Sequence, residues 1–163
     1  FSLGFFQANG IRAVNLNVAK VSPIMLKERG ATSARDLLTL QFDALHLADP
    51  GFCASAVSAF GADDLVREFV TTPADAVAVA GAAAHQLGLD AGALLMLCAG
   101  APTEAAAVLS QLVPRGGSLG GTAPVTLLDT GLRAQTLTAL GYTAEAVQAQ
   151  TCCGATDLEK LGF

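Results

Sequence analysis

The chain has 163 residues, of which 52% are hydrophobic and 14% charged, and its formal net charge is −5. The length suits one domain, and this composition excludes a chain that is disordered throughout. It also argues against nucleic-acid binding, because affinity for a phosphate backbone needs clustered Lys and Arg, whereas the nine basic residues here are scattered through an acidic chain.

The first segment, residues 1–21, has the only good strand pattern in the sequence. Between residues 14 and 18, apolar side chains alternate with asparagines, which would place the apolar ones on one face of a strand. A turn signal at Asn9-Gly10 would let this strand pair with the residues before it as a hairpin. We therefore expect an extended or β-hairpin N-terminal arm that binds a partner subunit, with the candidate partner-binding residues Phe1, Phe5, Phe6, Val14, Leu16 and Val18.

Residues 22–113 are predicted to form a helical body. A polar cap followed by proline marks helix starts at Ser22, Asp49 and Thr72. The cap oxygen accepts a bond from a free amide, and proline costs nothing where the N–H has no helical partner. Further candidate caps, without a following proline, are Asp63, Asp90, Thr143 and Thr156. Glycines stand where left-handed helix stops are expected, at Gly30, Gly61, Gly88, Gly141 and Gly162.

The glycine-rich segment 114–124 is predicted to be a linker. Gly116, Gly121 and Thr122 have almost the spacing of a phosphate-binding loop. The lysine that should precede the hydroxyl residue is missing, and Pro124 interrupts the helix that should follow. We therefore expect no nucleotide cofactor there.

Residues 125–163 are predicted to be short helical repeats. Each unit has a short cap, one or two helical turns and a glycine followed by an aromatic, as at Gly141-Tyr142 and Gly162-Phe163; looser copies occur in the helical body. Helices of about two turns are unstable alone, since marginal stability needs roughly 12 residues or more. We therefore expect an all-α fold of short helical repeats stacked as a solenoid-like or compact helical array.

The apolar residues of these units are expected to be mostly buried. The predicted core is Leu37, Leu40, Phe42, Leu45, Phe52, Val57, Phe60, Leu65, Phe69, Leu94, Leu97, Leu109, Leu112, Leu137, Leu140, Tyr142, Leu158 and Leu161.

Residue types that carry chemistry are few. The four cysteines, Cys53, Cys98, Cys152 and Cys153, lack the paired spacing of a zinc site, so we expect no metal. They also lack a disulfide framework, which favours a reducing or intracellular compartment. The adjacent pair at 152 and 153 would be redox-sensitive if it were exposed.

One histidine, His46, suggests a catalytic alternative. Asp43 and Asp49 lie three residues before and after it, so a helix could hold the imidazole between carboxylates as a general base. The stronger interpretation is that both aspartates are helix caps, because one follows an aromatic stop and the other precedes a proline. A small enzyme or redox protein using His46 or a cysteine is the first alternative function.

A membrane location is the second alternative. Between Ala76 and Pro114 the only formally charged residues are Asp90 and Glu104. Polar residues, glycines and a proline interrupt this run before it reaches the roughly 18 apolar residues that a span needs. Closely packed helices in a protein core are favoured over a subunit of a membrane complex.

The leading prediction is a non-enzymatic structural or interaction module. So little charge is available to cover an isolated globule that we expect other protein subunits to cover part of it. The chain would then connect or cement subunits of a larger assembly, such as a multi-protein, cytoskeletal or capsid-like complex, in a cell, organelle or virion. No small-molecule substrate is predicted. A start at Phe1 and a stop within a repeat favour a fragment or processed product.

Overall fold

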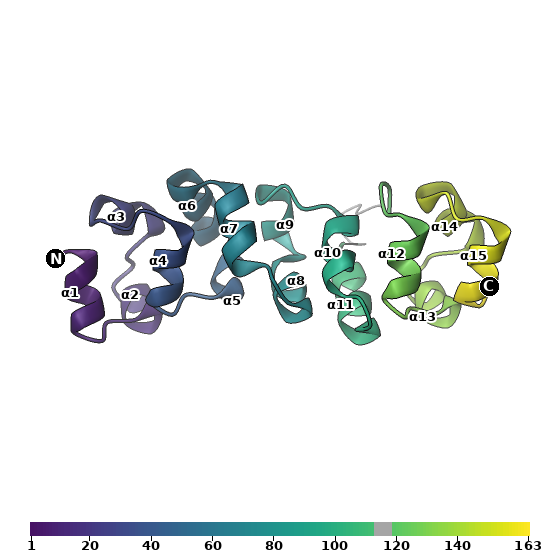
Figure 1. Cartoon of the computed structure of the whole chain (residues 1–163), viewed down its shortest axis with the longest axis horizontal. Coiled ribbons are helices and arrows are strands. Elements are labelled where there is room, and N and C mark those ends of the chain that lie inside the picture. The colour runs from purple at the N-terminus through teal and green to yellow at the C-terminus, as the bar shows by residue number, and fades with distance from the viewer. Residues whose placement is uncertain (113–118) are drawn as a thin grey trace. The chain divides into compact units, whose positions relative to one another are not determined.

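The computed structural model describes residues 1–112 and 119–163, and these residues are all-helical, with no strand among them, so the all-α prediction is confirmed (Figure 1). The helices are α1 (Leu3–Ala8), α2 (Ala13–Val18), α3 (Pro23–Glu28), α4 (Ala34–Thr39), α5 (Ala44–Leu47), α6 (Pro50–Phe60), α7 (Ala62–Phe69), α8 (Pro73–Val79), α9 (Ala82–Gln86), α10 (Ala91–Leu97), α11 (Pro102–Leu112), α12 (Pro124–Asp129), α13 (Ala134–Ala139), α14 (Ala144–Thr151) and α15 (Ala155–Leu161).

The chain divides into two compact units. Unit 1 consists of Phe1–Thr71 with Ala82–Gly88, and unit 2 of Thr72–Gly81 with Leu89–Phe163. Unit 1 therefore contains α1 to α7 and α9, and unit 2 contains α8 and α10 to α15.

The expected extended or hairpin arm over residues 1–21 is wrong, because α1 and α2 occupy this segment. An alternation over only five residues fits a helix as well as a strand: Val14 and Val18, four residues apart, share a solvent-facing side, while Leu16 turns into the core. The backbone needs no neighbouring sheet, since the helices satisfy it and the Ala13 amide donates to the Leu40 carbonyl at 2.7 Å.

A unit of ten or eleven residues recurs in both halves of the chain. Six-residue helices begin at residues 3, 13, 23 and 34, and again at 124 and 134. After most of them one residue has a positive φ, and the amide of the next residue donates to a carbonyl in the helix. Examples are Val21 to Leu16 at 2.9 Å and Tyr142 to Leu137 at 2.9 Å. This closure terminates each helix after less than two turns and turns the chain sharply.

Gly61 differs from the predicted left-handed stop, because its ψ of 150° is extended and it also begins α7. All five predicted stop glycines have a positive φ, between 69° and 104°. Lys20 and Gln41 take the same left-handed position without being glycine, with φ of 53° and 63°. The predicted proline-marked caps are also confirmed: the side chains of Ser22, Asp49 and Thr72 each accept from the amide three residues on.

Two of the remaining cap predictions are right and two are wrong. Asp90 and Thr143 cap α10 and α14. Asp63 and Thr156 instead lie inside α7 and α15, because glycines at 61 and 154 begin those helices earlier. Glycine has no side-chain oxygen, so neither helix start has a side-chain cap bond to its first amides.

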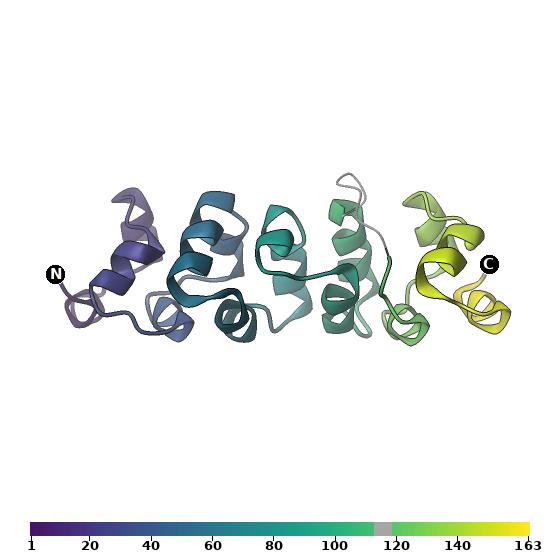
Figure 2. The same ribbon diagram turned by 90° about the horizontal axis from the view of Figure 1, so that it is seen from above.

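Several helices pack on the helix three places further along the chain. In unit 1, α3 packs against α6 and α4 against α7; in unit 2, α8 packs against α11 and α12 against α15. Bonds join these partners across about thirty residues. The Ala34 amide donates to Asp64 Oδ2 at 2.7 Å, and Gln111 Nε2 donates to the Val77 carbonyl at 3.0 Å. Figure 2 shows the crosswise short helices and their tight connections from above.

Asp36, in the first turn of α4, has a shifted pKa. Burial raises the pKa of Asp36, but hydrogen bonds donated to its carboxylate by the amides and side chains of Thr32 and Ser33 outweigh burial. The Thr32 amide lies only 2.7 Å from Asp36 Oδ2. The pKa of this carboxyl is therefore lowered in the folded chain.

The core largely follows the predicted apolar residues. Ten of the eighteen are buried and seven are half-buried. Leu45 is the exception, since it is 70% exposed. The assignment of this residue to the core was therefore wrong.

The expected linker lies partly outside the described residues, which resume at Leu119. From there the chain packs on unit 2: Leu119 and Thr122 are buried, and the Leu119 amide donates to Gln150 Oε1 at 2.8 Å. Residues 116–118 of the phosphate-loop-like sequence also lie outside the described residues.

Candidate binding surface

The candidate site is the outer face of α2 and α5 in unit 1. The first residue of each helix, Ala13 or Ala44, is buried, so the second residue turns outward. Val14 is 68% exposed and Leu45 70%. Val14 and Val18, one helical turn apart, form an exposed apolar stripe on α2, and Leu45 is exposed on α5. We call these three residues the α2–α5 face.

Two hollows border this stripe. One, of about 460 Å³, is lined by residues that include Lys20, Leu45 and Phe52. The other, of about 390 Å³, lies along α2 and is lined by residues that include Val14 and Val18. Asn17 and His46 line both hollows and therefore form the wall between them. Each volume lies in the range of small binding sites, which is about 300–1,000 Å³.

Local structure fixes the orientation of His46. Its ring packs edge-on against Phe42, at 5.1 Å between centroids, and lies 6.1 Å from the Phe52 ring. Its Nδ1 lies 2.7 Å from Oδ1 of Asp43, the N-cap of the same helix. The Asp43 amide also donates to Nδ1, at 3.1 Å, in the capping box of α5, so Nδ1 contacts both the amide and the carboxylate of Asp43.

The other parts of a catalytic site are not assembled around this pair. Asp49 does not join the imidazole but accepts the Phe52 amide at 2.7 Å as a helix cap. In the part of the chain that the structure describes, no hydroxyl or thiol hydrogen-bonds to His46. Cys53 is fully buried, and burial raises the pKa of its thiol, which disfavours the reactive thiolate.

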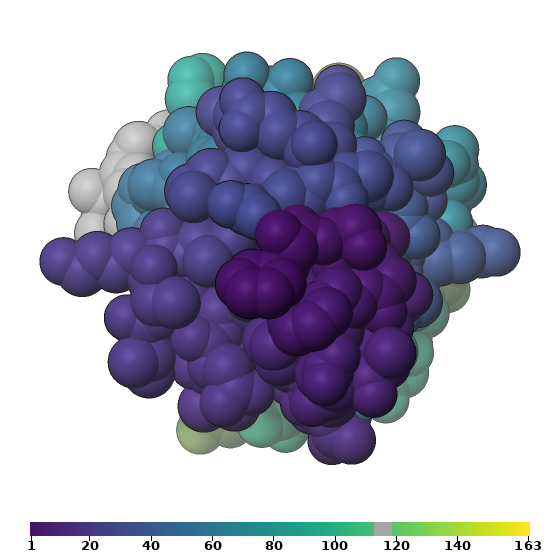
Figure 3. Space-filling model, turned by 90° about the vertical axis from the view of Figure 1, so that its left-hand side faces the viewer, coloured from purple at the N-terminus to yellow at the C-terminus, as the bar shows by residue number. Residues whose placement is uncertain are grey.

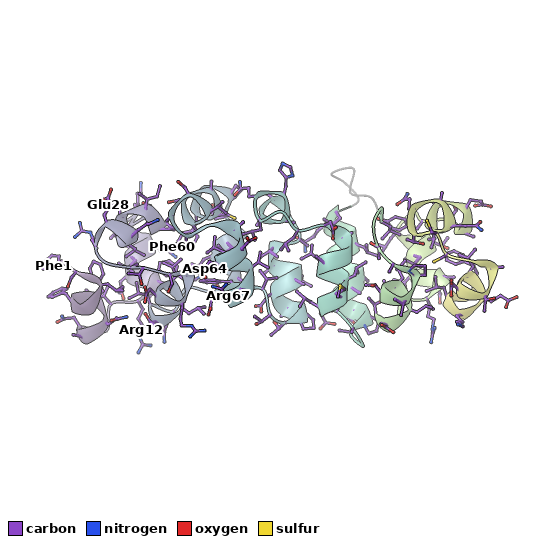
Figure 4. All side chains as sticks on the ribbon, turned by 45° about the horizontal axis from the view of Figure 1, so that its top comes forward. Phe1, Arg12, Glu28, Phe60, Asp64 and Arg67 are labelled. Atoms are coloured by element: carbon purple, nitrogen blue, oxygen red, sulfur yellow. The ribbon has the colours of Figure 1, made fainter. Side chains whose placement is uncertain are left out.

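Two cations stand at the ends of α2. Arg12 immediately precedes the helix and Lys20 follows it, and both side chains are exposed. Figure 4 shows Arg12 pointing away from the helical body. Its Nη1 donates to Gln41 Oε1 at 3.0 Å, and neither cation forms an ion pair within the described ranges.

The structure separates the predicted partner-binding residues into two groups. Phe6 and Leu16 are 7% and 2% exposed, so they belong to the core of unit 1 and cannot serve as a free surface. Phe1 and Phe5 stack on each other, with ring centroids 4.4 Å apart, and α1 is uncovered on the side shown in Figure 3. Val14 and Val18 remain exposed, on a helix instead of a strand.

Sequence reasoning missed Leu45, Arg12 and Lys20 as members of this surface. The available signal was the repeat itself. Leu45 is the second residue of its helix, as Val14 is, and follows a small buried alanine in the same way. Aligning the repeats by their closing turns would have placed both residues on one side.

The remaining chemistry-bearing residues do not gather elsewhere. His85 is exposed on α9, and Cys98 is buried. Cys152 is exposed in a left-handed conformation, while Cys153 is buried with its sulfur 2.9 Å from Thr151 Oγ1. Over residues 1–112 and 119–163, no group of three or more His, Cys, Asp and Glu residues could hold a metal ion.

Comparison of the chain with protein-family models, with curated proteins and with solved structures finds no match. None of the described helices combines the length and apolarity needed to cross a membrane.

Proposed function

We propose that the chain is a non-enzymatic structural or interaction module that connects protein subunits of a larger assembly through the α2–α5 face. The observation that carries the proposal is the exposure of Val14, Val18 and Leu45 on two helices whose residues Asn17 and His46 line the same two hollows. Single exposed apolar residues are normal on protein surfaces, whereas several of them beside two hollows are typical of an interaction site.

The finer fold proposal is a solenoid within each unit, with three short helices per turn. Three observations support it: the spacing of about ten residues between many helix starts, the packing of several helices on the third one along, and the bonds across about thirty residues. Such an array holds its surface residues at fixed spacing, because every repeat is positioned by its neighbours. That rigidity lowers the entropic cost of binding.

A second candidate function is proton-transfer catalysis by His46. The 2.7 Å contact with Asp43 favours it, because a carboxylate on Nδ1 orients a histidine that acts through Nε2. The same contact also completes the cap of α5, since the His46 amide donates to Asp43 Oδ1 at 3.3 Å. The local capping role accounts for both residues without a substrate.

The two functions are separated by paired variants in extracts of the source cells. Val14→Ser with Leu45→Ser should move the protein from a high-mass complex to the elution position of its monomer in size-exclusion chromatography. The far-UV circular dichroism should stay unchanged, because both side chains are exposed. The control is Val125→Ser, which changes a 59% exposed valine of unit 2 and should leave the complex intact. A wild-type chain that migrates only as the monomer would count against the proposal.

A further inference from the structure

Another hollow of unit 1, which we call the α1–α2 hollow, lies beside the closing turns of α1 and α2. Its volume is about 530 Å³, within the range of small-molecule sites. Phe6, Ile11, Leu16 and Val21 belong to its lining. The Ile11 amide donates to the Phe6 carbonyl at 2.9 Å. The Val21 amide donates to the Leu16 carbonyl at the same distance, so backbone bonds fix the apolar walls. No residue of the α2–α5 face lines this hollow.

Among the described residues, Arg29 alone supplies charge to the lining of the α1–α2 hollow. It is half-buried and directly follows α3. Its carbonyl accepts the Leu3 amide at 2.9 Å, and its Nη1 donates to the Phe1 carbonyl at 3.0 Å. Two bonds to the start of the chain therefore fix both the backbone and the guanidinium of this residue.

The guanidinium of Arg29 keeps unmet hydrogen-bond donors. Within residues 1–112 and 119–163, Nη1 has the bond to Phe1, whereas Nε and Nη2 have no partner. Glu28 is exposed and lines a neighbouring hollow, and it forms no ion pair with Arg29 in the described ranges. Partial burial makes unmet donors of a charged group costly, so an acceptor that enters the hollow is stabilised there.

The other cations of unit 1 are in different situations. Lys27 Nζ donates to a main-chain carbonyl and lies over an aromatic ring. Arg35 and Arg67 form ion pairs with carboxylates of α7, and Arg12 and Lys20 are exposed to water. Arg29 therefore differs from them in combining partial burial, unmet donors and an apolar hollow.

We propose that the α1–α2 hollow binds a small apolar monocarboxylate, with its carboxylate on the Nε and Nη2 edge of Arg29 and its hydrocarbon part against Ile11 and Val21. Unit 1 already shows this geometry: Arg35 donates from Nε and Nη2 to the two oxygens of Glu68, both at 3.1 Å. Such a two-bond pair matches the planar fork of a guanidinium to a carboxylate.

The rest of the lining selects a single negative charge on an apolar molecule. The amide side chains of Asn9 and Asn15 are engaged with main-chain groups, at 2.8 and 3.2 Å. One cation neutralises one carboxylate, whereas a phosphate dianion would keep an unpaired charge beside apolar walls. This inference goes beyond the proposed interaction face and does not depend on it.

The test titrates the full chain with sodium octanoate, 1-octanol and sodium acetate, and measures affinity by calorimetry and the site by methyl NMR. Octanoate should bind and shift the methyl signals of Ile11 and Val21. Octanol lacks the charge and acetate lacks the hydrocarbon chain, so each should bind at least about tenfold more weakly.

Matched variants locate the carboxylate. Arg29→Gln should weaken octanoate binding at least about tenfold. Ala19→Glu adds an acid at an exposed position in the lining and should abolish binding by repulsion. The control is Arg133→Gln in unit 2, since Arg133 Nη1 also donates to a main-chain carbonyl, that of Lys160, at 3.0 Å. This variant should bind octanoate normally, and circular dichroism checks that each variant is folded.

The contrary results are distinct. Equal affinities for octanoate and octanol, or unchanged octanoate binding in Arg29→Gln and Ala19→Glu, would overturn the carboxylate site. Absence of octanoate binding would overturn the inference and leave the interaction face standing, because Val14 and Leu45 do not line this hollow. Octanoate that shifts the methyl signals of Val14 and Leu45 instead would place it on the α2–α5 face and would also overturn the inference.

Discussion

Replacing Asp64 by alanine tests whether the helices are held by bonds across about thirty residues. Asp64 lies in the first turn of α7, but its Oδ2 accepts the Ala34 amide at the start of α4, at 2.7 Å. The residue that carries this amide is fully buried, so water cannot easily replace the lost acceptor. Figure 4 shows Asp64 beside Arg67, to which its other oxygen bonds.

The expected cost follows from these contacts. A buried amide that loses its partner costs about 1–3 kcal/mol. The ion pair adds at most about 1 kcal/mol, because the Arg67 side chain is 69% exposed. We expect Asp64→Ala to destabilise unit 1 by about 2–3 kcal/mol. Asp64→Asn, which keeps a neutral acceptor for Ala34, should cost less.

Asp63→Ala is the matched control, since Asp63 is in the same helical turn but exposed. It loses only the interaction with the helix dipole, of about 0.3–1 kcal/mol. Urea unfolding followed by circular dichroism measures the stability, and hydrogen exchange of the Ala34 amide reports the bond directly. Equal costs for the two alanine variants, with unchanged Ala34 exchange, would refute the reasoning.

Three further predictions concern the repeat. Leu37→Ala, at a fully buried position, should cost about 2–5 kcal/mol in urea unfolding. Gly141→Ala, at a φ of 92°, should cost about 1–2 kcal/mol in the same assay, whereas Gly4→Ala within α1 should stabilise by about 0.5–1 kcal/mol. Because the folded pKa of Asp36 is lowered, its stabilisation is present above the ordinary carboxyl pKa of about 4 and lost as pH falls through the folded value. Urea midpoints of Asp36→Asn should therefore be lower than wild type at pH 7 and fall less steeply with pH in the range below about pH 5.

Local features of the fold could be predicted from the sequence because their physics is local. Ser22 and Asp49 cap helices through amides only three residues away, and the stop glycines act on their own backbone. Those interactions depend only on residues that are close together in the sequence. The all-α class could be predicted because helix caps and stop glycines recur at short intervals along the chain.

The N-terminal helices could not be predicted in this way. The apolar and polar pattern of residues 14 to 18 fits a strand and a helix equally well over so short a stretch. The choice is made by distant contacts, such as the bond from Ala13 to Leu40 and the burial of Leu16. Neither contact is visible without knowing which helix packs on which.

The residues of the candidate surface could be predicted only in part, because their exposure also depends on which helix packs on which. Val14 and Val18 were expected to bind a partner and are exposed, but Phe6 and Leu16 are buried. Leu45 was assigned to the core because a leucine in a short helix usually packs inward. Its exposure depends on the side of α5 that faces α2, which is a property of the assembled repeat.

The most direct test of the interaction face is site-specific photo-crosslinking in the source cells. A benzophenone amino acid replaces Leu45 in one variant and Val125, the exposed valine of unit 2, in another. The account predicts a discrete crosslinked band with another protein from position 45, reduced when Val14 is also changed to serine, and no such band from position 125. No crosslink from position 45, or the same bands from both positions, would contradict it.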